Sequence, residues 1–154
     1  MVLRDRNNTT GIGLVEIYDL DSKAPAKLTN ISTRGFVDTG NNLMIAGFII
    51  GPSGSGAATV LVMAKGPSLA AAGTQVPLQD PILELHDGNG VLISNNDDWK
   101  KGANQIDIVG SGLAPSDVRE SAIFTSLKPG AYTAIVRGKN NTTGIGLVDV
   151  YSLE

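Results

Sequence analysis

The stretch NNTTGIGLV occurs twice in this chain, at residues 7–15 and again at residues 140–148. The offset from Asn7 to Asn140 is 133 residues (140 − 7), and equivalent pairs continue at the same offset: Arg4/Arg137, Glu16/Asp149, Ile17/Val150, Tyr18/Tyr151 and Leu20/Leu153. Similarity at one fixed period is the signature of repeat proteins. We therefore expect one full repeat unit at residues 22–154, preceded at residues 1–21 by a duplicate of the strand that closes the unit. Such a chain is expected to be a piece of a longer tandem array.

The composition indicates a cysteine-free β domain. Of the 154 residues, 42% are hydrophobic, 18% are charged and 19 are glycine, a balance typical of short strands joined by tight turns. The net charge of −3 comes without a basic cluster, which argues against a nucleic-acid partner. The absence of cysteine excludes disulfides and thiolate metal sites. The longest apolar runs, such as residues 43–50, are too short for membrane insertion as a helix.

Both copies of the duplicated stretch are predicted to form a hairpin. Residues 2–3 and 12–20 flank the first Asn-Asn-Thr-Thr-Gly turn, and residues 132–137 and 146–151 flank the second. Asn and Gly tolerate the positive φ that tight hairpin turns require. Residues 19–26, DLDSKAPA, have the composition of a linker, and their proline blocks ladder pairing. This linker is expected to join one module to the next.

Further strands are predicted by apolar runs bounded by turn residues, at residues 26–31, 43–50, 57–64, 82–86, 91–95 and 120–126, with a flexible turn at 51–56. Residues 67–73 read as a helical turn, and residues 105–109 as a helical turn or a short strand. The predicted fold is an all-β, jelly-roll-like antiparallel β-sandwich of about nine or ten strands with one or two short helical turns. Alternation assigns to its core Val15, Ile17, Ile45, Leu61, Leu83, Ile93, Ile123, Tyr132 and Val148.

The C-terminal half carries a recognisable pattern. It runs DPILELHDGNGVLISNNDDW from Asp80 and, after a variable link, RESAIFTSLKPGAYTAIVRG up to Gly138. This pattern resembles the bacterial pre-peptidase C-terminal domain, and the whole unit is similar to modules repeated in very large secreted proteins of environmental bacteria. The resemblance implies a jelly-roll-like sandwich on a secreted or surface protein, with a non-catalytic role in adhesion, spacing or substrate attachment. The long N-terminal half departs from the shorter family pattern and leaves the strand order open.

One acidic cluster is a candidate calcium site, composed of Asp87, Asn89, Asn95, Asp97 and Asp98. These residues lie in a predicted hairpin turn and the loop after it, and Ca²⁺ prefers several carboxylate and carbonyl oxygens on a flexible loop. The spacing is not that of an EF-hand, because the distal bidentate glutamate is missing. The competing interpretation is that these side chains cap turns and bond their own backbone. Ca²⁺ is the candidate cofactor of this sequence.

No motif predicts an enzyme. His86 is the only histidine, and the G-x-S-x-G turn of a serine hydrolase is absent. The acids that could be imagined as a glycosidase pair, namely Glu84, Asp107, Asp117 and Glu120, have no sequence feature that brings two of them together. Glu120 follows Arg119 and could pair with it. Residues 65–68 could hold an anion at a helix N-terminus, and a loop cap is the competing interpretation.

The duplicated strand predicts self-association. One repeat offers one native position for the G-I-G-L-V strand, and the chain carries two copies. A copy without a position exposes apolar side chains and an open edge that invites pairing with another chain, as in β-strand donation. Such a contact is heterologous and can propagate into a filament. The candidate residues are Ile12, Leu14, Val15, Ile17, Tyr18, Ile145, Leu147, Val148, Val150 and Tyr151. The competing arrangement places both copies in one sheet of a closed monomer.

The sequence therefore predicts a non-catalytic structural or adhesive repeat module of a bacterial extracellular or surface protein. Its expected partners are other copies of itself or adjacent repeats. The alternative is a calcium- or carbohydrate-binding accessory domain of a secreted protein, with a surface glycan as ligand.

Overall fold

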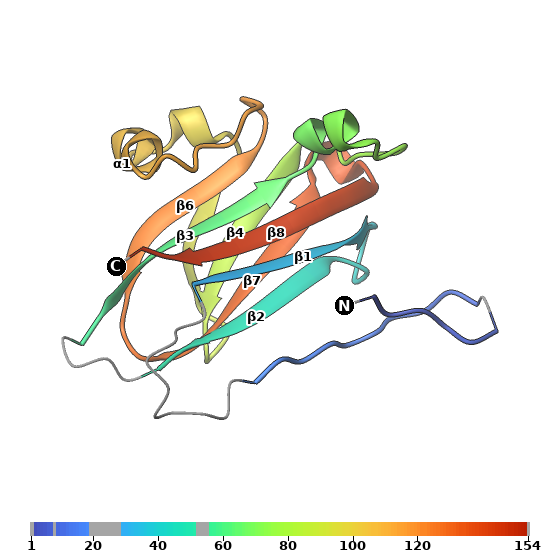
Figure 1. The fold of residues 1–154 in the computed structure, drawn as a ribbon, viewed down its shortest axis with the longest axis horizontal. Coiled ribbons are helices and arrows are strands. Elements are labelled where there is room, and N and C mark those ends of the chain that lie inside the picture. Colours follow the sequence, from blue (N-terminus) through green and yellow to red (C-terminus); the bar gives the residue numbers. More distant parts are fainter. Residues whose placement is uncertain (1, 8, 19–28, 52–55, 154) are drawn as a thin grey trace.

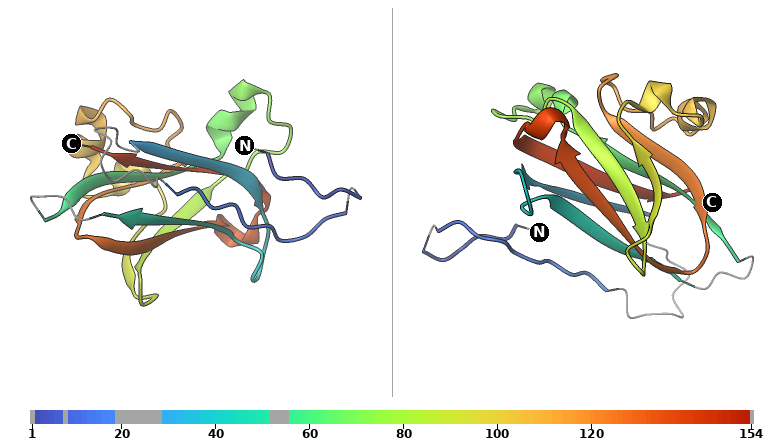
Figure 2. Two further views of the ribbon diagram at one scale, coloured as in Figure 1. Left: turned by 60° about the horizontal axis from the view of Figure 1, so that its bottom comes forward. Right: turned by 180° about the vertical axis from the view of Figure 1, so that it is seen from behind.

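The computed structural model describes residues 2–7, 9–18, 29–51 and 56–153. The strands among these residues are β1 (Asn30–Val37), β2 (Met44–Ile50), β3 (Ala58–Lys65), β4 (Pro81–Asp87), β5 (Leu92–Asn96), β6 (Ser121–Leu127), β7 (Gly130–Gly138) and β8 (Gly144–Ser152). They pair antiparallel in two four-stranded sheets, in the orders β1-β8-β3-β6 and β2-β7-β4-β5. Figures 1 and 2 show the two sheets facing each other as layers. The predicted all-β sandwich is confirmed, with eight strands among the described residues instead of nine or ten.

Short helices complete the described part of the fold. They are η1 (Pro67–Ala72), η2 (Trp99–Lys101), α1 (Gln105–Gly110) and η3 (Lys139–Asn141). The helical turn predicted at residues 67–73 is present, with Pro67 at its start and Gly73 at its end in the left-handed region, φ 85°. Residues 105–109, for which a helical turn and a short strand were both open, belong to the helix α1.

The core has two parts because β3 buries both of its faces. Between the sheets, alternate residues of β3 such as Val60 and Val62 pack with residues of β4, β7 and β8. On the other face of β3, Leu61 and Met63 pack with Trp99 and with Ile108 of α1. Burial on both faces explains the uninterrupted apolar run of this strand, ATVLVMA.

The predicted core is right for the central strands and wrong at four positions, which are Ile45, Ile93, Val15 and Ile17. Leu61, Leu83, Ile123 and Val148 are buried, and Tyr132 packs against the core. Ile45 is 60% exposed and Ile93 is 43% exposed, because both lie on edge strands with their side chains on the outer side. In the run MIAGFII of β2, the buried residues are Met44 and Phe48, so the inward alternation includes neither Ile45 nor Ile49.

Both predicted hairpins of the duplicated stretch are also wrong for the described residues. In the C-terminal copy, β7 pairs with β2 and β4 in one sheet, whereas β8 pairs with β1 and β3 in the other. In the N-terminal copy, the described part of the predicted hairpin of residues 2–3 and 12–20 contains no strand. The chain does turn at Arg6 and Asn7, where the Asp5 carboxylate accepts hydrogen bonds from the backbone N–H groups of Asn7 and Thr9. Neither arm is a strand, and the predicted core residues Val15 and Ile17 are 45% and 66% exposed. The predicted linker at 19–26 and most of the predicted turn at 51–56 lie outside the described residues.

The two kinds of predicted core isoleucine can be compared directly. Replacing the buried Ile123 by Ala should lower the free energy of unfolding by about 2–5 kcal/mol, because it leaves a cavity between the sheets. The matched change Ile45→Ala should cost less than about 1 kcal/mol, since an exposed strand position loses mainly β propensity. Denaturant unfolding of both variants measures these costs. Equal losses would contradict the assignment of Ile45 to the outer face.

Candidate functional site

The C-terminal copy of the duplicated stretch is β8, an interior strand of its sheet. It pairs antiparallel with β1 from Asn30↔Tyr151 to Val37↔Gly144, and with β3 from Val60↔Ser152 to Lys65↔Leu147. Without β8, β1 has no neighbour in this sheet among the described strands. We call the position between β1 and β3 the closing-strand slot.

A third wall of the closing-strand slot explains why its occupant begins Gly-Ile-Gly. The segment Val76–Leu78 runs parallel to the start of β8 and forms the bridge Pro77↔Ile145. The Ile145 N–H donates to the Val76 carbonyl at 2.7 Å, and the Leu78 N–H donates to the Ile145 carbonyl at 2.9 Å. A Cβ at Gly144 would lie 2.7 Å from the backbone N of Leu78. A Cβ at Gly146 would lie 3.1 Å from Val37 Cγ2. Only glycine allows this close approach of backbone at Gly144.

The two faces of β8 are matched to different surroundings. Val148 and Val150 are buried in the main core. On the opposite face, Tyr151 packs against the second cluster, and Asp149 forms an ion pair with Lys65 at 2.8 Å from Nζ to Oδ2. The Asp149 side chain is only 5% exposed, so this pair is largely withdrawn from solvent. Removing one partner of such a pair leaves a buried charge and is strongly destabilising.

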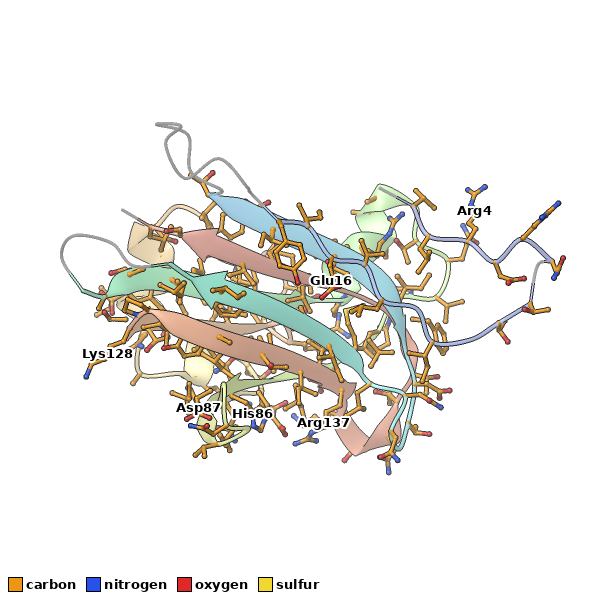
Figure 3. The ribbon with its side chains drawn as sticks, turned by 90° about the horizontal axis from the view of Figure 1, so that it is seen from below. Arg4, Glu16, His86, Asp87, Lys128 and Arg137 are labelled. Atoms are coloured by element: carbon orange, nitrogen blue, oxygen red, sulfur yellow. The ribbon has the colours of Figure 1, made fainter. Side chains whose placement is uncertain are left out.

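The N-terminal copy has the same residues in a different environment. Among its apolar side chains, Ile12 is 91% exposed, Leu14 78% and Tyr18 64%. The described part of this segment runs outside both sheets, on the side where β1 and β2 form the sheet edges (Figures 1 and 2). Figure 3 labels Glu16, the counterpart of Asp149, on this outlying segment. We call residues 11–18 the free copy.

The free copy keeps one glycine that only the closing-strand slot requires. Gly11 corresponds to Gly144, yet a Cβ at Gly11 would meet no atom within 4 Å. Over residues 11–18, only two positions differ from residues 144–151: Glu16 stands for Asp149, and Ile17 for Val150. The free copy therefore has the chemistry of a strand for this slot while lying outside it.

The candidate calcium residues are not gathered at one point. Asp87 lies at one end of the β4–β5 hairpin, where its Oδ1 accepts the N–H groups of Asn89 and Val91, each at 2.9 Å. Asp97 and Asp98 lie beyond the other end of β5, paired with Lys139 at 2.7 Å and Lys101 at 2.6 Å. Asn95 is a residue of β5 itself.

No group of three or more His, Cys, Asp or Glu residues suited to a metal ion occurs within the described part of the chain. The contacts around Asp97 include a carboxylate that the sequence prediction missed, that of Asp80, which lies 3.6 Å from Lys139 Nζ. Burial raises the pKa of Asp80, and the Lys139 ammonium opposes that rise. Calcium binding at these residues stays a prediction.

The remaining acids have structural contacts. Glu84 pairs with Arg137 at 3.0 Å and lies 3.4 Å from His86, on the side of the molecule labelled in Figure 3. Arg119 pairs with Asp117 at 2.8 Å and holds the pKa of that carboxyl below its usual range. Glu120, the other partner considered for Arg119, makes different contacts.

Glu120 is fully buried, and it fills the anion position predicted at the start of η1. Its Oε1 accepts hydrogen bonds from the N–H groups of Gly66 and Ser68 and from the Ser68 hydroxyl, at 3.0, 3.1 and 2.6 Å. The anion at this turn is therefore the protein's own side chain. No local sequence motif predicts this contact, because Glu120 is 52 residues from Ser68.

The fold and the slot define a two-sheet β-sandwich whose closing strand is present in duplicate. No family model matches the sequence, and no curated protein matches it. Among solved structures, the chain is similar to the pre-peptidase C-terminal domain of a collagenase from Bacillus anthracis, with a TM-score of 0.49 and 12% identity over 79% of this chain and 89% of that one. The tandem-repeat origin stays a prediction.

No helix among the described residues combines the length and apolar character needed to cross a membrane.

Equivalent glycines in the two copies should respond differently to substitution. Gly144→Ala should lower the free energy of unfolding by about 1–3 kcal/mol, because the new methyl group overlaps the backbone at Leu78. Gly11→Ala should leave it within about 0.5 kcal/mol, because the free copy offers open space there. Denaturant unfolding of the two variants gives the comparison. Equal destabilisation by both changes would show that the N-terminal copy is packed as tightly as β8.

Proposed function

We propose that this chain is a non-catalytic structural module of a bacterial extracellular protein, and that it joins other copies of itself by strand donation. The observation that carries the proposal is the pair of nearly identical strands, of which one fills the closing-strand slot and the other is exposed. The donated segment is the free copy, and the acceptor is the closing-strand slot of a second copy of the chain.

The chemistry of the slot supports this choice of partner. In the acceptor, Gly11 and Gly13 would lie against the segment Val76–Leu78, as Gly144 and Gly146 do now. Val15 and Ile17 would take the core positions of Val148 and Val150. Backbone pairing with two neighbours would give affinity, and the glycine positions and alternating side chains would give specificity.

Donation of this kind follows the thermodynamics of domain swapping. The incoming strand replaces an equivalent strand, so the acceptor sheet keeps its pairing and its core. The displaced β8 then becomes an unplaced strand in its turn. Because donor and acceptor surfaces differ, the contact is heterologous, and successive donations lead to an open filament. Assembly therefore requires release of β8 and is favoured by high protein concentration.

The extracellular setting comes from the resemblance of the C-terminal half, residues 80–138, to a domain of secreted bacterial proteins. Adhesion to a surface glycan and calcium binding stay predictions from the sequence. No contact among the described residues favours either of them over strand donation.

The test is refolding at two concentrations. The full chain is unfolded in denaturant, refolded at low or high protein concentration, and sized by light scattering after gel filtration. We expect monomers at low concentration and dimers with larger species at high concentration. The double variant Val15→Lys/Ile17→Lys should remove these species, weakening association at least about tenfold, because it would bury two charges in the acceptor core.

A matched control separates insertion into the closing-strand slot from non-specific hydrophobic association. Ile12→Lys removes an apolar side chain that is 91% exposed, more than Val15 (45%) or Ile17 (66%). Its counterpart Ile145 is only partly buried in β8, so a lysine there can extend to solvent. This variant should assemble like the parent chain. The proposal fails if the full chain stays monomeric after refolding at high concentration. It also fails if Val15→Lys/Ile17→Lys assembles undiminished.

A further inference from the structure

We infer that the free copy is a second occupant of the closing-strand slot of its own chain, so that one sandwich can be closed by either end. In the observed fold, β8 fills the slot and residues 11–18 lie outside. In the alternative fold, residues 11–18 fill the slot and residues 144–151 are released. The inference rests on the proposed role of the slot, and it adds an intramolecular competitor to the donated strand.

The connectivity permits this exchange without moving any other strand. Tyr18 is followed by 11 residues before β1 begins at Asn30, and Asn30 is the residue that faces Tyr151 at the end of β8. With Tyr18 in the place of Tyr151, the free copy and β1 become neighbouring antiparallel strands joined by a single loop. Such hairpins close with loops as short as two residues, so an 11-residue connection is sufficient.

The direction of the strand is also correct. β8 is antiparallel to both β1 and β3. A strand that precedes β1 through a hairpin is necessarily antiparallel to β1, and it is therefore antiparallel to β3 as well. The register follows from the offset between the copies: Leu14 takes the place of Leu147 opposite Arg34, and Ile12 takes the place of Ile145 opposite Phe36.

Three features favour β8 in the observed fold. First, β8 follows β7 after only the short turn η3, whereas the free copy needs the longer connection to β1. Second, Asp149 is fitted to Lys65 at 2.8 Å, and Glu16 is one methylene longer. Third, Val150 is 8% exposed in the core, and Ile17 adds a methylene there. These differences are small, so the alternative fold is a minor state of the same chain and not an excluded one.

Disulfide trapping tests the inference on the full chain, which has no cysteine of its own. Facing residues of an antiparallel pair have a Cα separation of about 4.5–5.5 Å, which a disulfide spans. Arg34→Cys/Leu147→Cys reports the observed fold, and Arg34→Cys/Leu14→Cys reports the alternative. Arg34→Cys/Ile12→Cys is the control for chance encounters, because Ile12 is two residues out of register. The variants are incubated at low concentration in a thiol–disulfide buffer and analysed by non-reducing electrophoresis.

We expect the Leu14 pair to form a disulfide within the monomer, several-fold more than the Ile12 control. A monomer without this disulfide overturns the inference. Disulfides of the Leu14 pair formed only between chains overturn it too, but leave strand donation intact, so the two proposals fail separately.

A second set of variants tests the two residues that bias the exchange. Glu16→Asp/Ile17→Val makes the free copy identical to residues 144–151, and Asp149→Glu/Val150→Ile gives β8 the residues of the free copy. Combined with the Leu14 pair, each change should increase the monomeric disulfide several-fold. Trapping that is unchanged in both backgrounds contradicts the inference, because the disulfide would then report collisions of an unstructured segment.

Discussion

The insertion of β8 between β1 and β3 is the interaction on which the rest of the sandwich depends. Within the part of the chain that the structure describes, it supplies the only partner of β1 in this sheet, and it connects that edge to the central strand β3. Its inward residues Val148 and Val150 fill the core opposite the second sheet, and burial of each is worth about 1.5–3 kcal/mol. The Gly-Ile-Gly start of β8 also holds Val76–Leu78 against the sheet. Loss of this strand would therefore expose the core and, at the same time, leave a sheet edge unpaired.

The chain shows that a strand is specified by its partners as well as by its own residues. Residues 11–18 and 144–151 differ at two positions, yet the first segment is exposed and the second is an interior strand. β propensity largely reflects packing against neighbours, so a segment with no neighbour gains little from it. What separates the copies is connectivity: β7 delivers residues 144–151 directly to the slot through a short turn.

The fold class could be predicted from the sequence because turn residues and apolar runs occur at sandwich spacing. The face of a strand was harder to predict. In the run MIAGFII of β2, apolar residues occur at both alternating sets of positions, so the pattern does not distinguish Ile45 from its buried neighbours. The pairing of Glu120 with Gly66 and Ser68 joins segments about fifty residues apart, and no local motif marks it.

The candidate site was visible in sequence as a duplication, because a repeated strand in a single unit exceeds the positions available to it. The geometry of this site could not be predicted from the sequence. Gly144 is required because the segment Val76–Leu78 pairs closely with the start of β8, and this contact joins segments distant in sequence. The same holds for the Lys65–Asp149 pair, whose partners come from adjacent strands. Residue types therefore identified the strand, and only the three-dimensional structure identified what holds it.

The most direct test of this account is amide hydrogen exchange of the dilute monomer, compared between peptides covering residues 11–18 and residues 144–151. The account predicts that the second segment is strongly protected, because its N–H groups belong to two ladders, while the first exchanges at close to the rate of an unstructured chain. Equal protection of both segments in the monomer would mean that both are paired in one closed sheet. That result would contradict the claim that one slot is shared by two strands.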